Sequence, residues 1–268
     1  MLLPHEWHGQ ARASETPLVL VSGLGAKGTS WYPFLEDVAR ERRVLTVDLP
    51  GSGSAPALTA GASLRDLARA LAATLEALDL VRFDVVGRSM GGQVAQELAL
   101  ADPSAIRKLV LSSTTGRVDE HLASVFRLWA EMAENGVPQA IRHRSSMLWC
   151  LGARALDDTD QAARYLAARR TGDRPKDYAN QARACAEHDA LDRLTQLDVP
   201  TLVLAGTDDR LMPKAHAEAL ARAIPNSRLR FIPDAGHLAY LEAPRTFHRE
   251  VAAFLEDETE CRNGTTTW

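Results

Sequence analysis

The chain has few cysteines, no long apolar run and no excess of positive charge, and each absence excludes a class of protein. Its three cysteines, Cys150, Cys185 and Cys261, lie far apart and form no C-x-x-C pair, so neither a disulfide framework nor a zinc site is expected. No apolar run approaches the roughly 18 residues of a membrane span. The first residues, MLLPHEWHGQ, lack the basic and apolar regions of a signal peptide. We therefore expect a cytoplasmic protein that binds no membrane.

The balance of charge argues against a nucleic-acid partner. The net charge is -4 at pH 7 over 268 residues, whereas binding to a phosphate backbone needs a basic excess. Apolar residues make up 46% of the chain and charged residues 25%, as is typical of a globular protein with a buried core. We expect a small-molecule substrate, and the sequence leaves open whether the protein is a monomer or a homodimer.

Short β-branched runs alternate with helical patterns along most of the chain. A capping-box pattern at Ser63 and Asp66, for example, begins a helix that is expected to run to Leu80. Continuous apolar runs of this length are typical of strands that are buried on both faces of a parallel sheet. The expected strands cover residues 18–21, 44–47, 83–86, 108–111, 201–205 and 229–232. The alternation predicts an α/β fold with a mostly parallel central sheet.

The alternation is interrupted between residues 116 and 195, where helical periodicity continues without convincing strands. We expect residues 1–115 and 196–256 to form the core, residues 116–195 a helical insertion, and residues 257–268 a flexible tail. The insertion holds 12 Lys and Arg against 12 Asp and Glu, so its net charge predicts no selection for an ionic substrate. Its large apolar side chains have the spacing of a core stripe, and some of them could also line a substrate pocket. These pocket candidates are Phe126, Trp129, Trp149 and Tyr165.

A serine stands between two glycines at the point where a strand pattern gives way to a helix pattern, in Gly87-Arg88-Ser89-Met90-Gly91. A sharp turn here would hold the serine in a strained backbone conformation and lift its Oγ clear of the sheet. The start of the following helix would present the Met90 N–H to a developing oxyanion. The motif therefore predicts that Ser89 is a nucleophile.

A serine nucleophile needs a base and an acid, and both residue types follow later strands. Asp209 comes after the strand at 201–205, and His237 comes after the strand at 229–232. Because the carboxyl ends of parallel strands meet at one edge of a sheet, we expect both side chains to lie near Ser89. Asp208, the neighbour of Asp209, follows the same strand. The sequence thus predicts a catalytic triad of Ser89, Asp209 and His237.

Taken together, these motifs resemble the α/β-hydrolase family, and enol-lactonases and carboxylesterases in particular, over roughly residues 16–256. The matching stretches are SGLG (22–25), DLPGSG (48–53), GRSMGG (87–92), GTDD (206–209) and GH followed by LEAP (236–244). The resemblance implies that the helical insertion is a lid and that the Leu24 N–H is the second oxyanion donor. It also implies that Asp209, three residues after Gly206, is a better candidate for the acid than Asp208. It also implies acyl transfer through Ser89 on an ester or a lactone, with a thioester as a further option, and it implies no cofactor and no metal.

Several other functions remain open from the sequence. Residues 23–28 also have the G-x-G-x-x-G spacing of a dinucleotide site, with Asp48 near the position of a ribose-binding acid. Pro33 argues against such a site because it would interrupt the helix that the fingerprint requires, and Asp48 is better explained by a turn. A ligand receptor, a biosynthetic cyclase or lyase, and a carbon–carbon bond hydrolase could all use the α/β-hydrolase fold.

Arg88 is unusual, because relatives of the family more often carry a smaller side chain immediately before the serine. One interpretation is that its guanidinium pairs with a carboxylate beside the turn. The other is that Arg88 shapes the substrate pocket or binds a carboxylate of the substrate.

Overall fold

The computed structural model describes residues 2–10, 16–168 and 174–257, so that the predicted tail lies almost entirely outside the described residues. A seven-stranded sheet has the order β1-β3-β2-β4-β5-β6-β7, in which β1 pairs antiparallel to β3 and every other pair is parallel. The strands are β1 His5–His8, β2 Leu18–Val21, β3 Val44–Val47, β4 Phe83–Arg88, β5 Ile106–Ser112, β6 Thr201–Gly206 and β7 Ser227–Ile232. The prediction of a mostly parallel α/β sheet is confirmed.

All six predicted strands form, each with bounds within two residues of the expected ones, and β1 is an additional strand. Only Trp7 is apolar in the β1 sequence His-Glu-Trp-His, and its burial pattern ranges from exposed to half-buried. An edge strand that pairs with one neighbour needs no apolar run, which is why the hydrophobic pattern does not reveal it.

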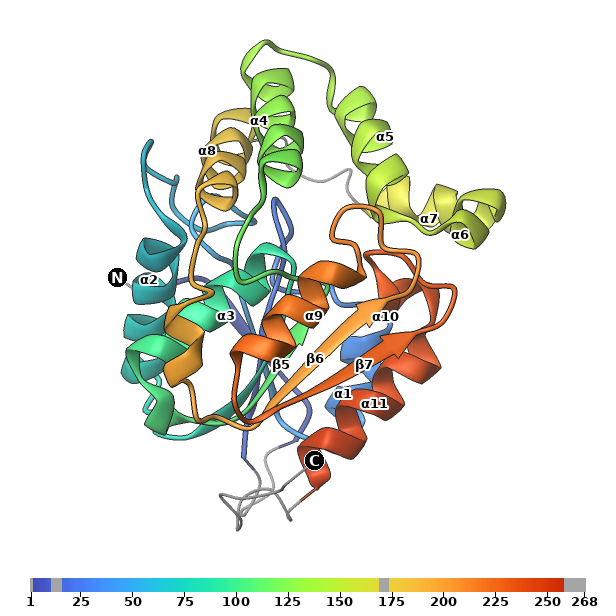
Figure 1. Cartoon of the computed structure of the whole chain (residues 1–268). Helices are drawn as coiled ribbons and strands as arrows, with labels where there is room; N and C mark the ends of the chain where they lie inside the picture. The colour runs from blue at the N-terminus through green and yellow to red at the C-terminus, as the bar shows by residue number, and fades with distance from the viewer. Residues whose placement is uncertain (1, 11–15, 169–173, 258–268) are drawn as a thin grey trace.

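Helices cover both faces of the sheet. The helix α2 begins at the predicted capping box, where the Ser63 side chain accepts the Asp66 N–H, and it ends at Ala77, before the expected Leu80. Figure 1 shows α1 and α11 on one side of the sheet and α2, α3 and α9 on the other. The helices outside the segment between β5 and β6 are α1 Phe34–Glu41, α2 Leu64–Ala77, α3 Met90–Ala101, α9 Lys214–Ala223, α10 Ala239–Glu242 and α11 Pro244–Glu256. Short 3-10 turns lie at Pro103–Ala105 and Arg193–Gln196.

The segment between β5 and β6 is helical. It contains α4 Glu120–Glu134, α5 Gln139–Cys150, α6 Ala153–Asp157, α7 Thr159–Ala168 and α8 Pro175–Ala186. Figure 1 shows these helices beyond the arrowheads of β6 and β7, with α4 and α8 packed side by side. In the described part of this segment, the only β pairing is a single bridge between Arg117 and Asp189. None of the described helices is long and apolar enough to cross a lipid bilayer.

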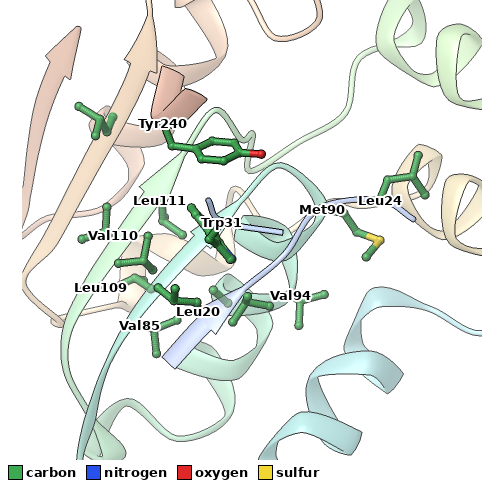
Figure 2. Packing of buried hydrophobic residues seen from close by; sticks show 14 of the residues in the cluster. Leu20, Leu24, Trp31, Val85, Met90, Val94, Leu109, Val110, Leu111 and Tyr240 are labelled. Carbon is green, nitrogen blue, oxygen red and sulfur yellow. The ribbon is translucent and has the colours of Figure 1, made fainter. Parts of the chain in front are cut away.

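The core lies between the sheet and its helices. Leu20, Val85 and Leu109, from three neighbouring strands, are completely buried, and Figure 2 shows them packed below Trp31. Burying a side chain of this size stabilises the fold by roughly 1.5–3 kcal/mol relative to leaving it exposed. At the carboxyl edge of the sheet, the Trp31 and Tyr240 rings lie 5.4 Å apart. The side chains around the ends of the strands are therefore closely packed.

Candidate active site

Ser89 occupies a sharp turn between β4 and α3. Its φ of 54° and ψ of -126° are strained for a residue with a side chain. The turn is held from both sides, because the Ser89 N–H donates to the Ser112 carbonyl oxygen at 3.0 Å and the Thr114 hydroxyl donates to the Ser89 carbonyl oxygen at 2.8 Å. The surroundings thus compensate for the strain that presents the serine at the carboxyl edge of the sheet.

The glycines on either side of Ser89 are required by close backbone approaches. A Cβ on Gly91 would lie 2.1 Å from the Val21 carbonyl oxygen, and a Cβ on Gly87 would lie 2.5 Å from the Gly91 carbonyl oxygen. No L side chain fits at either position without moving β2 or α3. This is the physical reason for the Gly-x-Ser-x-Gly spacing in this chain.

The structure brings Asp209 and His237 into direct contact. Asp209 Oδ2 lies 2.9 Å from His237 Nδ1, so an ionised Asp209 accepts a hydrogen bond from Nδ1–H. The other carboxylate oxygen, Oδ1, accepts the N–H groups of Leu211 at 3.0 Å and Met212 at 2.8 Å. The Asp208 carboxylate instead accepts the Ala153 N–H. Asp209, and not Asp208, is therefore the carboxylate that contacts His237.

The second nitrogen of the histidine, Nε2, is buried and has no hydrogen-bond partner in the described parts of the chain. His237 and Ser89 are 4% and 7% exposed, so both side chains lie almost out of contact with bulk water. A buried ring nitrogen without a partner is costly in a stable fold. It is therefore well suited to receive a proton from another group at this site.

Leu24 lies in the loop after β2, and Met90 is the first residue of α3 (Figure 2). Within the described ranges, neither backbone N–H donates to another group of the chain. The neighbouring Gly25 N–H donates to Gln181 Oε1 at 2.9 Å, and the amide nitrogen of Gln181 donates to the Pro50 carbonyl oxygen at 2.8 Å. Gln181 of α8 therefore holds the loop that carries Leu24. The sequence analysis did not identify this residue.

The glycine-rich loop at residues 23–28 has a structural partner of its own. Asp48 Oδ1 accepts the Gly28 N–H at 2.7 Å, and Asp48 Oδ2 accepts the Ser54 N–H at 2.8 Å. The next helix, α1, begins only at Phe34, after Pro33. A helix that starts there cannot place its N-terminus against a phosphate held by the glycines, so the arrangement lacks the geometry of a dinucleotide site.

A cavity of about 700 Å³ lies beside the segments that carry Leu24, Ser89 and His237. Its lining includes Gly25, Arg88 and Leu238, which are the sequence neighbours of Leu24, Ser89 and His237. Tyr165, one of the pocket candidates, lines this cavity as well. The lining does not include Phe126, Trp129 or Trp149.

The three remaining pocket candidates lie elsewhere among the described helices. Phe126 and Trp129 are buried on α4, 1% and 4% exposed, and their rings lie 5.9 Å apart. Trp149 lies with its ring 5.6 Å from that of His121. Helical spacing predicts that such residues share one face of a helix, but it does not predict what that face contacts. Their role in a substrate pocket stays a prediction.

Glu242 is a second residue that the sequence analysis missed. Its Oε2 accepts the N–H groups of Gly236 at 2.9 Å and Gly152 at 3.0 Å, and its Oε1 accepts the Leu238 N–H at 3.3 Å. Burial raises the pKa of this carboxyl above the ordinary value for glutamate. Glu242 therefore ties both sides of His237 to the junction between α5 and α6. Its place in the LEAP stretch was a sequence signal for the family, but it carried no information about this role.

Comparison with known proteins agrees with the geometry. The family model for the alpha/beta hydrolase fold matches residues 16–244. The protein named "Putative carbamate hydrolase RutD" from Pseudomonas syringae pv. syringae (strain B728a) is 32% identical over 265 residues, covering 95% of this chain and 99% of that protein. A thermophilic esterase from Thermogutta terrifontis is 29% identical, with a TM-score of 0.84 over 94% of this chain and 92% of the esterase.

The enol-lactonase from Burkholderia xenovorans LB400 superposes with a TM-score of 0.87 over 95% of this chain and 96% of the lactonase. Its sequence identity of 24% limits that likeness to the fold. The family model matches most of the chain. Two of the similar proteins are named as a carbamate hydrolase and an esterase, which supports hydrolase activity. The chain therefore belongs to the alpha/beta hydrolase fold family.

Proposed function

We propose that the protein is a serine hydrolase that forms an acyl-enzyme on Ser89, with His237 as the base and Asp209 as the residue that orients it. The proposal depends mainly on the contacts of the two ring nitrogens of His237. Nδ1 is engaged by Asp209 at 2.9 Å, while the buried Nε2 has no partner in the described chain. Such an imidazole is held in one tautomer with its basic nitrogen available, as a general base requires.

The proposed reaction has two halves. Ser89 Oγ attacks the carbonyl carbon of the substrate as its proton passes to His237 Nε2, and the N–H groups of Leu24 and Met90 stabilise the oxyanion. The protonated histidine gives its proton to the leaving oxygen, which departs as an alcohol from an ester or stays on the acyl group as a hydroxyl when a lactone ring opens; either way the acyl group is left on Ser89. Water then attacks the acyl-enzyme in the same way, and the acid is released. Asp209 stays ionised throughout and stabilises the imidazolium.

The proposed substrate is a small ester or lactone, with a thioester following the same steps. A carbamate is the second candidate, because a relative named as a carbamate hydrolase is 32% identical and covers 95% of this chain. A carbamate presents the same kind of acyl carbonyl, and its leaving group can receive the proton from the same histidine. We also propose that residues 116–195 act as a lid over the remaining core. The position of α4 to α8 beyond the carboxyl ends of the strands supports this role (Figure 1).

Labelling with a fluorophosphonate probe, followed by peptide mapping, tests the proposal directly. We expect the probe on Ser89 in the natural protein and no label in Ser89→Ala. Hydrolysis of 4-nitrophenyl acetate should fall by up to roughly 10⁶ in the variant, as when a catalytic triad is disrupted. A folded natural protein that takes no label, or that stops after one equivalent of ester, would instead favour a receptor or a non-hydrolytic enzyme.

A further inference from the structure

Ser30 lies where three segments of the candidate active site meet. It ends the loop at residues 22–30 that carries Leu24, called here the Leu24 loop. Two residues from distant parts of the chain donate hydrogen bonds to Ser30. One is Arg88, which immediately precedes the proposed nucleophile, and the other is Tyr240, which follows the proposed base. The contacts of Ser30 therefore join the segments that carry the proposed oxyanion donor, nucleophile and base.

Arg88, the last residue of β4, reaches across to Ser30 with its guanidinium. Nη2 donates to Ser30 Oγ at 3.0 Å and, over a longer 3.4 Å, to the Ser30 carbonyl oxygen. The side chain is 4% exposed, and its guanidinium carbon lies 5.1 Å from the Trp31 ring centroid and 4.7 Å from that of Tyr240. Contact with two rings restrains a guanidinium. Arg88 therefore ties Ser30 firmly to the end of β4.

The hydrogen bonds continue from Ser30 to the other end of the Leu24 loop. A guanidinium can only donate, so the Ser30 hydroxyl accepts from Arg88 and has its own proton to give. Ser30 Oγ donates to Ser22 Oγ at 3.3 Å, and Ser22 Oγ donates to the Gly28 carbonyl oxygen over a longer 3.5 Å. Hydrogen bonds that point the same way along a chain polarise and strengthen one another. Both ends of the Leu24 loop are thus held by a chain of contacts that begins at Arg88.

Tyr240 of α10 holds Ser30 from the side of the histidine. Its hydroxyl donates to the Ser30 carbonyl oxygen at 3.1 Å. The side chain is 7% exposed, and its ring lies 5.4 Å from that of Trp31 (Figure 2). Tyr240 comes three residues after His237 in the same short segment. A shift of Ser30 would therefore be felt on both sides of the site.

Gly23 lies in a narrow space between the nucleophile and the guanidinium. A Cβ built on Gly23 would stand 3.2 Å from Ser89 Cβ and 3.4 Å from Arg88 Nη1. The backbone next to Leu24 is therefore packed against both residues. A change of the Arg88 side chain alters the wall against which the Leu24 loop rests, as well as the hydrogen bonds at its end.

We infer that Arg88 and Ser30 are positioning residues, which hold the Leu24 loop where the Leu24 N–H stabilises the oxyanion. The inference rests on the proposed function, since it concerns how the same site is assembled. An oxyanion donor lowers the barrier only if it is already aimed at the position where the negative charge develops. A displacement of about 1 Å can cost about 10² in rate. A long guanidinium before the serine is thus explained by the distance it spans to Ser30.

Steady-state kinetics on 4-nitrophenyl acetate tests the inference, because this ester is neutral and a lost ion pair with the substrate cannot change its rate. We expect Arg88→Met to lower kcat by roughly 10- to 100-fold and Ser30→Ala by roughly 3- to 10-fold, with little change in KM. Arg88→Lys should recover part of kcat, since an ammonium can still donate to Ser30. The double variant Arg88→Met/Ser30→Ala should be no slower than Arg88→Met, because both changes break the same chain of contacts.

A matched control and an inhibitor separate positioning from a general loss of structure. Ser227→Ala removes a hydroxyl that donates to the Ala221 carbonyl oxygen at 2.7 Å, at the start of β7 and outside the cavity lining, and it should keep the natural kcat. A methyl trifluoromethyl ketone adds to an activated serine and develops the same oxyanion. Its inhibition constant should rise in Arg88→Met and Ser30→Ala in parallel with the fall in kcat/KM.

Natural kcat in both Arg88→Met and Ser30→Ala, or losses that multiply in the double variant, would overturn the inference. Ser30→Ala decides the matter if circular dichroism shows that Arg88→Met is not folded. Ser89→Ala separates the inference from the proposed function. Full activity in Ser89→Ala would remove the proposed function, whereas an inactive Ser89→Ala beside natural kcat in the Arg88 and Ser30 variants would remove the inference alone.

Discussion

The backbone N–H of His237 donates a hydrogen bond to the backbone carbonyl oxygen of Cys150 at 2.9 Å, so the loop that carries the proposed base is bonded directly to the end of α5. The two segments are in close contact, since a Cβ on Gly236 would lie 2.3 Å from the Gly152 backbone nitrogen. Glu242 spans the same contact through the N–H groups of Gly236 and Gly152. The proposed base and the helical segment therefore share one hydrogen-bonded junction, and a change in this junction should alter catalysis.

Glu242→Gln should lower kcat for a 4-nitrophenyl ester by roughly 10- to 100-fold, because a small displacement of a catalytic group is costly. A glutamine amide has one acceptor oxygen, so it cannot accept all three N–H groups that the carboxylate accepts. Glu36→Gln, on the exposed surface of α1, is the matched control and should keep the natural kcat. An unchanged kcat in a folded Glu242→Gln would show that the junction does not position His237.

The same variant should reveal the raised pKa of Glu242. Burial disfavours the ionised carboxyl in the folded state, so the folded protein binds this proton more tightly than the unfolded chain. The natural protein should therefore lose stability relative to Glu242→Gln as the pH rises from the ordinary glutamate pKa towards the raised one. Urea unfolding of both proteins between pH 4 and 7 measures the difference, and all other carboxyl groups cancel. A difference that does not depend on pH would contradict the raised pKa.

Asp209→Asn should reduce kcat by roughly 10⁴, with little change in KM. An asparagine amide that donates to Nδ1 would hold the imidazole in the tautomer that has its proton on Nε2, where it cannot accept the serine proton. Asp208→Asn is the matched control, since the Asp208 carboxylate bonds to the Ala153 N–H rather than to the histidine. Steady-state kinetics on one ester settles the comparison: a larger loss in Asp208→Asn would mean that the acid has been misassigned.

Gly23→Ala should lower kcat by up to roughly 10² while the protein stays folded. The added Cβ would stand 3.2 Å from Ser89 Cβ, so the serine or the loop that carries Leu24 must move apart by a few tenths of an ångström. Kinetics together with the midpoint of urea unfolding distinguishes a displaced nucleophile from a general loss of stability. If this variant has the same kcat as the natural protein, the loop accommodates a methyl group without affecting the site.

His188 should make the protein less stable at mildly acidic pH. Burial lowers the pKa of His188 to about 4, whereas the unfolded chain binds a proton near the ordinary value of 6.5. Stability is therefore fully present above pH 6.5 and is lost as the pH falls towards 4, by at most about 3.5 kcal/mol at roughly 1.4 kcal/mol per pKa unit. His188→Gln should remove this part of the acid sensitivity in urea unfolding. An NMR titration that places the His188 pKa near 6.5 would contradict the prediction.

Local patterns were enough to predict much of the fold. The apolar runs that became β2 and β3 are buried along their whole length, so their hydrophobic signal was strong and their bounds were predicted correctly. The edge strand β1 was missed because it is partly exposed and has no apolar run. The order of the strands also explains why Ser89, Asp209 and His237 were predicted to lie together, since each follows a strand whose direction in a parallel sheet fixes where it ends.

The sequence by itself determined the order of β2 to β7 along the chain, the glycine-flanked turn at Ser89 and the candidates for its base and acid, because these depend on local sterics and on the periodicity of apolar residues. Only the tertiary structure decided which side chains line the cavity, that Arg88 is held between Trp31 and Tyr240, and that Glu242 joins the His237 loop to α5. Those contacts join segments from distant parts of the chain. Neighbouring residues do not encode such contacts, which arise when the packing of the whole sheet and its helices brings the segments together.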